Sequence, residues 1–248
     1  MPGPEGKAVI PATRKKRRGP TPRHPFDVLH GTDTGNLIPG DDLSTGHRHD
    51  RHITAYHGVA PSLFGKLMAK WLPLRKHSVE ATAFLDIGAG KGRAMLLATQ
   101  YPFRRIVGVE LHPALAAAAR SNIELWQAAH DTPTIRLEED DAMRLRMPAG
   151  PCLLFLFNPF DIVLMDRLMD RLAERFKDRP GELDLLYVND EQREMIRDYH
   201  KGFRELWRGR IHHSHEDRDA DKAIIEHDAG GLYMTSGHED CGIWRFGQ

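Results

Sequence analysis

From residue 83 onward, short apolar runs alternate with segments of helical periodicity, and this order restricts the fold more than any other feature of the chain. The expected strands span residues 83–87, 104–111, 134–139, 152–158 and 182–189. The expected helices span residues 92–101, 113–130, 161–176 and 191–199. Alternating strands and helices predict a parallel sheet with helices on both faces. The near-continuous apolar character of the strands fits a sheet that is buried on both sides.

The segments on either side of this alternation are expected to complete the fold. Residues 26–60 are rich in turn-forming residues, which predicts a long ordered loop or cap, and residues 63–72 have the spacing of an amphipathic helix. Four later segments are interpreted as strands: 203–211, 222–227, 231–237 and 242–247. An antiparallel hairpin is expected to close the sheet edge. The predicted organisation is a tail over 1–25, a cap segment with its helix over 26–80 and an α/β domain over 81–248.

The N-terminal tail, residues 1–25, is basic and is expected to be disordered. It contains seven Lys and Arg residues against one acidic residue, a net charge of +6, whereas the whole chain has a formal net charge of zero. It is rich in Pro and Gly and has no apolar periodicity, as is typical of disordered segments. The basic run 14–18 could bind an acidic partner such as nucleic acid. A solvated tail without a partner is the alternative.

Composition also restricts the setting in which the chain works. No apolar run approaches the roughly 20 residues needed to span a membrane, so no membrane partner is expected. The N-terminus lacks the apolar segment of a signal peptide. Cys152 and Cys241 are the two cysteines, and they cannot form a CxxC metal site or a disulfide framework. A reducing, cytoplasmic location is therefore expected.

The stretch FLDIGAGKGRAMLLA, residues 84–98, has three glycines in five positions between the first expected strand and its helix. In an open α/β sheet, ligands bind at the carboxyl ends of the strands, and glycine turns there let a ligand lie against backbone N–H groups. Gly88, Gly90 and Gly92 have the spacing G-x-G-x-G, whereas a dinucleotide fold uses G-x-G-x-x-G. Asp86 precedes the turn, where a carboxylate would repel a pyrophosphate and attract an ammonium group.

Acidic residues also follow the next two expected strands. Glu110 ends the second strand, where a carboxylate can accept from both hydroxyl groups of a ribose. Asp141, or its neighbour Asp140, follows the third strand and can accept from the exocyclic amine of adenine. Asp86, Glu110 and Asp141 therefore match an amino acid, a ribose and an adenine, the parts of S-adenosylmethionine. Taken singly, they could be a helix cap, a solvated strand end and a surface charge.

The segments FLDIGAGKGR, IVGVEL, EDDA and LFLFNPF together resemble the class I S-adenosylmethionine-dependent methyltransferases. Within that class, the chain looks like a bacterial group that pairs a DxGxGKGR loop with GxDTG and NPF segments. HGTDTG over residues 30–35 and NPF over 158–160 match these segments, and the likeness covers residues 26–190. It implies an α/β fold with a Rossmann-like, mostly parallel seven-stranded sheet flanked by helices, an antiparallel last hairpin and an N-terminal cap.

The resemblance also implies roles for individual residues. Asp86 and Gly88 would face the methionine part of the cofactor, and Glu110 would face the ribose. Asp141 and Ala142 would face the adenine. The full set expected to contact S-adenosylmethionine is Thr32, Asp33, Thr34, Asp86, Gly88, Ala89, Gly90, Gly92, Glu110, Leu111, Asp141, Ala142 and Asn158. The first three of these, in the GxDTG segment, would close over the cofactor.

Asn158 is also the expected catalytic residue, because it ends the fourth strand beside the position of the methyl group. Its carbonyl could hold a substrate amine or the amino group of the cofactor, although Asn before Pro also forms turns. The missing second proline of an NPP[YF] motif disfavours a nucleobase acceptor. His30, Tyr56 and His57 could take a proton from the acceptor.

Two groups of histidines have spacings that could bind zinc or nickel, although no functional metal is expected. They are His47, His49 and His52 with Asp50, and His212, His213 and His215 with Glu216 and Asp217. Histidines this close together in flexible sequence more often bind metals weakly and without a function.

The sequence thus predicts an enzyme that transfers a methyl group from S-adenosylmethionine to an unidentified small molecule or protein side chain. One alternative is an NAD-dependent oxidoreductase, which the glycine spacing and Asp86 disfavour. Another is a non-catalytic module that binds a cofactor, or binds nucleic acid through the basic tail.

Overall fold

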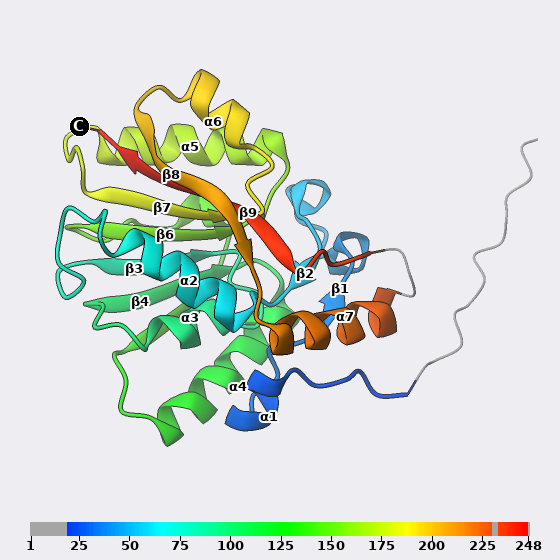
Figure 1. The fold of residues 1–248 in the computed structure, drawn as a ribbon. Helices are drawn as coiled ribbons and strands as arrows, with labels where there is room; N and C mark the ends of the chain where they lie inside the picture. The colour runs from blue at the N-terminus through cyan, green and yellow to red at the C-terminus, as the bar shows by residue number, and fades with distance from the viewer. Residues whose placement is uncertain (1–18, 230–232, 248) are drawn as a thin grey trace, which may run out of the picture.

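The computed structural model describes residues 19–229 and 233–247. Seven strands form its central sheet: β3 (Ala83–Ile87), β4 (Arg105–Glu110), β5 (Ile135–Glu139), β6 (Cys152–Phe157), β7 (Leu183–Val188), β8 (Phe203–His212) and β9 (His238–Phe246). Their order is β5-β4-β3-β6-β7-β9-β8 (Figure 1). The five neighbouring strands β5, β4, β3, β6 and β7 are parallel to one another, and β9 is antiparallel to both β7 and β8. The Rossmann-like α/β fold with an antiparallel last hairpin is therefore confirmed.

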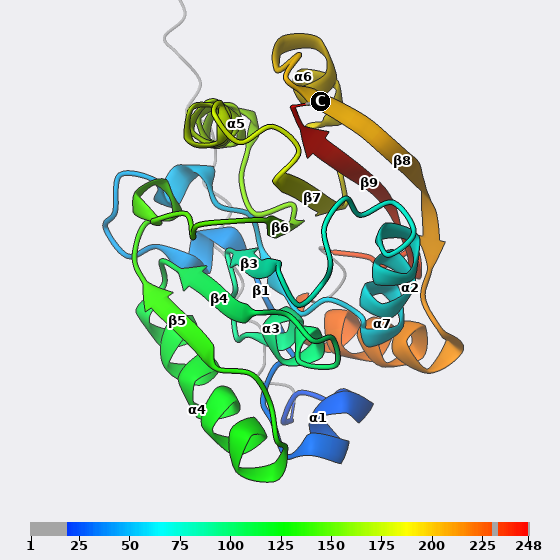
Figure 2. The same ribbon diagram turned by 90° about the vertical axis from the view of Figure 1, so that its left-hand side faces the viewer.

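Helices cover both faces of the sheet (Figure 2). One face packs against α2 (Pro61–Trp71), α3 (Arg93–Ala98) and α4 (Pro113–Ala129), and the other against α5 (Ile162–Phe176) and α6 (Arg193–Tyr199). Strand β3 is buried along its whole length. Phe84 packs in the core on the side of α2, α3 and α4, whereas Leu85 and Ile87 pack in the core on the side of α5 and α6. Successive side chains of a strand point to opposite faces of the sheet. Because helices cover both faces here, nearly every residue of the strand is apolar. In the described part of the chain, no helix is both long and apolar enough to cross a membrane.

The helices begin where the sequence offers a cap. Asp161 accepts hydrogen bonds from the N–H groups of Val163 and Leu164 and so begins α5. Pro113 is the first residue of α4, a position that suits its fixed φ and missing N–H. Each helix expected between residues 83 and 199 is present, with ends that differ by a few residues from the sequence-based boundaries.

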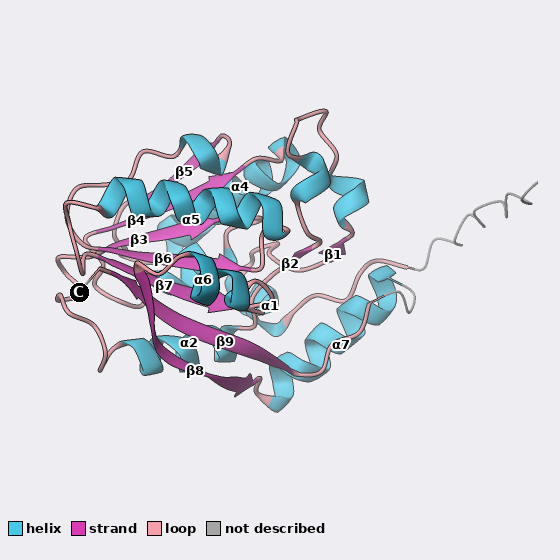
Figure 3. Cartoon of the chain, turned by 90° about the horizontal axis from the view of Figure 1, so that it is seen from above, coloured by secondary structure: helices cyan, strands magenta, loops and turns pink. Residues whose placement is uncertain are grey.

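The region before α2 forms a cap beyond the carboxyl ends of the parallel strands (Figure 3). It contains α1 (Pro25–His30), the 3₁₀ helices η1 (Gly40–Leu43) and η2 (Asp50–His52), and a two-stranded antiparallel sheet of β1 (Leu37–Ile38) and β2 (Tyr56–His57). Most of residues 26–60 therefore lie in turns and short elements.

The part of the predicted tail that the structure describes is packed against the rest of the chain. Residues 1–18, with the basic run 14–18, lie outside the described residues. Thr21 Oγ1 donates to Asp228 Oδ1 at 2.8 Å, and His24 is fully buried. Both contacts are made with α7 (His215–Ala229), since the Nε2 atom of His24 lies 3.6 Å from Asp217 Oδ1.

The prediction of strands over 222–227 and 231–237 is wrong for the residues that the structure describes. Residues 222–227 belong to α7, whose buried residues Asp217, Asp221, Ile224 and Ile225 recur at helical spacing. The two adjacent isoleucines suggested a strand, but packing against the cap selects a helix. Residues 233–237 form a connection without a strand, whereas Gly230, Gly231 and Leu232 lie outside the described residues.

Candidate functional site

A pocket opens at the carboxyl ends of β3, β4, β5 and β6, beneath the cap. It contains about 980 Å³ of space outside protein atoms, including the part open to solvent. The residues predicted from the sequence that line it are Asp86, Gly88, Ala89, Gly90, Glu110, Leu111, Asp141 and Ala142. Asp140, the residue before Asp141, also lines the pocket. The structure thus brings the acidic residues and the glycine loop together at the place where ligands bind in open α/β sheets.

The glycine loop takes a backbone path that needs its glycines. Gly88, Gly90 and Gly92 have φ values of +72°, +54° and +89°, which lie in the left-handed region that other residues rarely adopt. The N–H groups of Gly88 and Ala89 both donate to Val109 O at 3.0 Å, which ties the loop to β4. The loop therefore turns sharply at the pocket floor and then begins α3 at Gly92.

Asp86, the fourth residue of β3, is a buried carboxyl group without a cationic partner. It is 4% exposed, and its Oδ2 has no hydrogen-bond partner among the described residues. Burial raises the pKa of Asp86 to about 8, and the nearby Glu110 carboxylate adds to this shift. Burying an unpaired carboxylate is unfavourable. A cationic ligand group in the pocket would supply the missing partner.

Glu110, the last residue of β4, is held across the mouth of the loop. Its Oε2 accepts from Gly90 N at 2.7 Å, and its Oε1 accepts from His112 N at 2.8 Å. Burial raises the pKa of Glu110, while these backbone N–H groups act in the opposite direction. Each carboxylate oxygen has a second lone pair. The group can therefore accept further hydrogen bonds from ligand hydroxyls while it holds the loop.

The structure distinguishes the two aspartates that follow β5. Asp141 is 4% exposed and caps the 3₁₀ helix η3 (Ala142–Arg144) by accepting from Met143 N at 2.9 Å. Its Oδ2 is buried and has no hydrogen-bond partner in the described part of the chain. Asp140 is an exposed residue, and its Oδ1 accepts from Asp141 N at 2.7 Å. This geometry favours Asp141 over Asp140 as a hydrogen-bond acceptor within the pocket.

The GxDTG segment anchors the cap to the glycine loop. Asp27 Oδ1 accepts from Thr32 Oγ1 at 2.7 Å and from Thr34 Oγ1 at 2.6 Å. The Arg93 guanidinium lies 3.3 Å from Asp27 Oδ2 and donates to Thr34 Oγ1 at 2.7 Å. All four of these residues are buried. The residues that line the described pocket do not include Thr32 or Thr34, so these threonines serve as parts of a buried junction.

A second junction joins the same two motifs. Lys91 Nζ lies 3.1 Å from both carboxylate oxygens of Asp33 and donates to Asn36 Oδ1 at 2.8 Å. Asn122 Nδ2 donates to Asp33 O and Lys91 O, each at 2.9 Å. Asp33 and Gly92 are likewise absent from the residues lining the described pocket. Lys91 and Arg93, the basic residues at the end of the glycine loop, therefore each have an acidic partner in the cap, Asp33 and Asp27.

Sequence reasoning missed the partners that build these junctions. Asp27, Lys91, Arg93 and Asn122 hold the cap and the loop together, but the sequence analysis assigned a role to none of them. The signal in the sequence was the presence of Lys91 and Arg93 beside the glycine loop. Buried cations at such a place require acceptors elsewhere in the chain, and the acidic residues near the GxDTG segment were the candidates. Tyr56, by contrast, was considered only as a base, whereas it lines the pocket and donates from its hydroxyl to Thr34 O at 2.8 Å.

Asn158 supports the pocket wall from behind. It has a left-handed backbone with φ of +38°, and its Oδ1 lies 3.4 Å from the Tyr187 hydroxyl. The following Pro159 and Phe160 line the pocket, but the lining of the described pocket does not include Asn158. Thr54 of the cap donates to Asn158 O at 2.6 Å. The NPF segment therefore supplies an apolar wall and a contact with the cap.

The candidate bases lie in different environments. His30 packs against Trp126, with 4.6 Å between the ring centroids, in the interface of α1 and α4. His57 lines the pocket, and its Nε2 lies 3.5 Å from Asp221 Oδ1. Burial lowers the pKa of His57 to about 4, so its imidazole is neutral near pH 7. Of the histidines expected as bases, the structure brings His57 to the pocket.

Comparisons with known proteins identify similar folds. No family model matches the chain, and no curated protein matches its sequence. A magnesium protoporphyrin IX methyltransferase from Synechocystis, solved with bound S-adenosylmethionine, is 12% identical over 75% of this chain and 76% of its own, with a TM-score of 0.46. A ribosomal protein L11 methylase from Lactobacillus delbrueckii is 10% identical over 74% and 77%, with a TM-score of 0.44.

Proposed function

We propose that the chain is a class I S-adenosylmethionine-dependent methyltransferase. Asp86 is the observation that carries this proposal, because its buried carboxyl group has an oxygen without a partner among the described residues. S-adenosylmethionine has an ammonium group that would form a charge-assisted hydrogen bond with this oxygen. The adjacent glycine loop leaves room for the ligand to approach the backbone.

The neighbouring strand ends support the same ligand. β3, β4 and β5 are adjacent in the sheet, so Asp86, Glu110 and Asp141 follow one another in a row. We infer that Glu110 accepts from the ribose hydroxyls and that Asp141 accepts from the adenine amine.

An NAD-dependent oxidoreductase is the alternative that these residues disfavour. A pyrophosphate at the glycine loop would meet the Asp86 and Glu110 carboxyl groups, both buried. The cations of the loop, Lys91 and Arg93, are already paired with Asp33 and Asp27. A diphosphate in this pocket would therefore lack a compensating charge from the loop.

The chain's own residues would align and desolvate the reactants. S-adenosylmethionine, when bound, supplies an electrophilic methyl group. Pro159, Phe160 and Phe157 form an apolar wall that would exclude water from the acceptor atom. The His57 imidazole lines the pocket and is neutral near pH 7, so it could accept a hydrogen bond from an acceptor hydroxyl or amine. Its pKa of about 4 makes it a weak base, even with Asp221 3.5 Å away.

Calorimetry on the full chain tests the cofactor. We expect S-adenosylmethionine and S-adenosylhomocysteine to bind and NADH not to bind. Asp86→Asn should weaken S-adenosylmethionine by about 100-fold, because it removes the partner of the ammonium group. Asp178→Asn is the matched control, since it removes an exposed carboxylate away from the pocket and should bind like the wild type. Binding of NADH alone, or unchanged binding by Asp86→Asn, would contradict the proposal.

The acceptor is proposed to be a small molecule or a protein side chain. A screen for S-adenosylhomocysteine release against metabolite and lysate fractions would identify it. Asn158 is proposed to influence turnover, because it directly precedes the wall residue Pro159 and its side chain accepts a hydrogen bond from the buried Tyr187 hydroxyl. Asn158→Ala should lower the rate with little change in cofactor affinity. Asn158→Gly separates the side chain from the backbone, since glycine adopts the left-handed φ without strain.

The basic run 14–18 is proposed to bind an acidic partner, in addition to the enzyme activity. Deleting residues 1–18 tests this without removing His24, which is buried. An adaptor would lose binding to a nucleic acid such as duplex DNA, whereas an enzyme should keep its cofactor affinity and turnover. If the deletion lost both nucleic-acid binding and enzyme turnover, the tail would have no role separate from the enzyme.

A further inference from the structure

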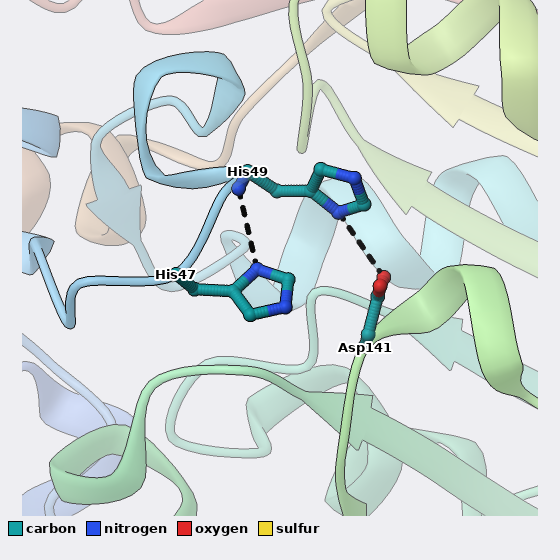
Figure 4. A group of neighbouring side chains, drawn as sticks. All are labelled: His47, His49 and Asp141. Atoms are coloured by element: carbon teal, nitrogen blue, oxygen red, sulfur yellow. Dashed lines mark hydrogen bonds and ion pairs between the residues drawn. The ribbon is translucent and has the colours of Figure 1, made fainter.

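Three side chains that can ligate metals meet at the rim of the pocket, between the cap and the end of β5. They are His47 and His49 from the cap and Asp141 from the loop after β5 (Figure 4). One ligand atom from each lies within 4.8 Å of the other two. Spacing in the sequence groups these histidines with His52 and Asp50, whereas the fold supplies a different carboxylate, Asp141, from a distant part of the chain.

The geometry of His49 and Asp141 is that of two ligands of one ion. His49 Nδ1 lies 3.3 Å from Asp141 Oδ1. Two atoms each about 2.1 Å from a tetrahedral zinc ion are about 3.4 Å apart. Both residues are 4% exposed, and His49 Nδ1 and Asp141 Oδ2 have no hydrogen-bond partner among residues 19–229 and 233–247.

His47 is presented to the same point by a loop that Asp50 holds in place. The carboxylate of Asp50 accepts from the N–H groups of Thr45 and Gly46 at 2.7 Å and of His47 at 3.0 Å. His47 Nδ1 accepts from His49 N at 3.2 Å, which leaves Nε2 to face the other two residues in Figure 4. Ligation through Nε2 would move the ring proton to Nδ1 and release this backbone contact.

The two remaining neighbours leave the site available. Arg48 lies 3.6 Å from Asp141 Oδ2, but its side chain is 69% exposed and can turn into solvent. His52 is occupied by other partners, because its Nδ1 lies 2.8 Å from Asp161 Oδ2 and its Nε2 accepts from Arg51 Nε. The ligand set is therefore two imidazoles and one carboxylate, which suits Zn²⁺, Ni²⁺ or Cu²⁺ better than Mg²⁺ or Ca²⁺.

We propose that His47, His49 and Asp141 form a transition-metal site that binds one zinc-type dication and closes the cap onto the end of β5. With three protein ligands, the ion keeps a coordination position for water. Asp141 is also the residue inferred to accept from the adenine amine. A metal ion would therefore compete with S-adenosylmethionine, and this one consequence rests on the proposed function.

Metal titrations of the full chain without cofactor test the site. Zn²⁺ measured by calorimetry and Co²⁺ measured by visible absorption should each bind with one ion per chain. His47→Ala, His49→Gln and Asp141→Asn should each weaken binding at least about tenfold. His215→Ala and Asp178→Asn, which change an exposed histidine and an exposed carboxylate outside the ligand set and the pocket, should bind like the wild type. Circular dichroism in EDTA checks that each variant is folded.

Two results would overturn the site. One is that the wild type binds Co²⁺ no more tightly than His47→Ala does. This variant is the one expected to disturb folding least, because His47 is only partly buried. The other is equal loss of binding in His215→Ala, which would indicate scattered surface histidines. Competition is measured separately, with S-adenosylmethionine titrated in Zn²⁺ and in EDTA, and weaker cofactor binding in Zn²⁺ is expected. Equal cofactor binding in both refutes competition, whereas no cofactor binding in either refutes only the proposed function.

Discussion

The ring of Tyr56 lies against Gly90, at the position that any side chain of residue 90 would occupy. Tyr56 comes from the cap and Gly90 from the loop after β3, so this contact joins the two layers that enclose the pocket. The Tyr56 hydroxyl is fixed by its bond to Thr34 O, at 2.8 Å, so the ring cannot move away without losing a partner. The middle glycine of the loop is thus required by the cap as well as by the backbone.

Gly90→Ala should therefore destabilise the protein and weaken cofactor binding. The new methyl group would overlap the Tyr56 ring, at a cost of about 1–3 kcal/mol, and the left-handed φ adds roughly 1–2 kcal/mol. Urea denaturation measures the sum. Gly31→Ala is the matched control, because Gly31 also has a left-handed φ but has open space around its Cα. The double variant Tyr56→Ala/Gly90→Ala should recover the part due to overlap, and strict additivity would contradict the contact.

The pKa of Asp86 makes the stability of the ligand-free protein depend on pH. Its folded pKa of about 8 lies above its ordinary value of 3.8, so the folded state holds this proton more tightly than the unfolded state. The contribution is favourable at low pH and is lost as the pH rises from about 4 through about 8. Urea unfolding at pH 5 and pH 9 should show a larger decrease for the wild type than for Asp86→Asn. An equal decrease in both would exclude Asp86 as the cause.

The same shift predicts proton release when the cofactor binds. At pH 7 the ligand-free Asp86 is mostly protonated, because its pKa is about 8. An ammonium group favours the carboxylate, so binding should release up to about one proton, and above pH 9 the release should vanish. Calorimetry in buffers with different ionisation enthalpies counts the protons. Asp86→Asn should show no release, and release that persists in this variant would assign the proton to another group.

The fold could be predicted from the sequence where local patterns and tertiary packing agree. Strands β3, β4, β6 and β7 are apolar runs buried on both faces, and α5 has both a cap at Asp161 and a regular apolar stripe. Prediction failed at α7, where the adjacent Ile224 and Ile225 suggested a strand. These isoleucines pack on the helix face that carries Asp217 and Asp221, and the partners of that face come from distant segments.

The candidate site could be predicted only in part for a similar reason. Asp86, Glu110 and Asp141 follow parallel strands, and the carboxyl ends of such strands meet at one edge of a sheet. The roles of Thr32 and Thr34 depend on Asp27, and the sequence contains no local pattern that joins Asp27 to Arg93, 66 residues away. Long-range ion pairs of this kind become visible only when the fold is known.

Asp27→Asn should show how much the cap depends on this junction. The substitution would leave Arg93, which is 2% exposed, without its opposing charge, and would weaken the acceptor for Thr32 and Thr34. Breaking a buried ion pair by removing one partner costs about 3–5 kcal/mol, so the midpoint of urea denaturation should fall markedly. Asp240→Asn removes the exposed partner of Arg210 and should cost less than about 1 kcal/mol. Equal losses in the two variants would mean that the Asp27 junction contributes no more than a surface pair. A loss of cofactor affinity in Asp27→Asn that exceeds the fraction unfolded would show that the junction also positions the glycine loop.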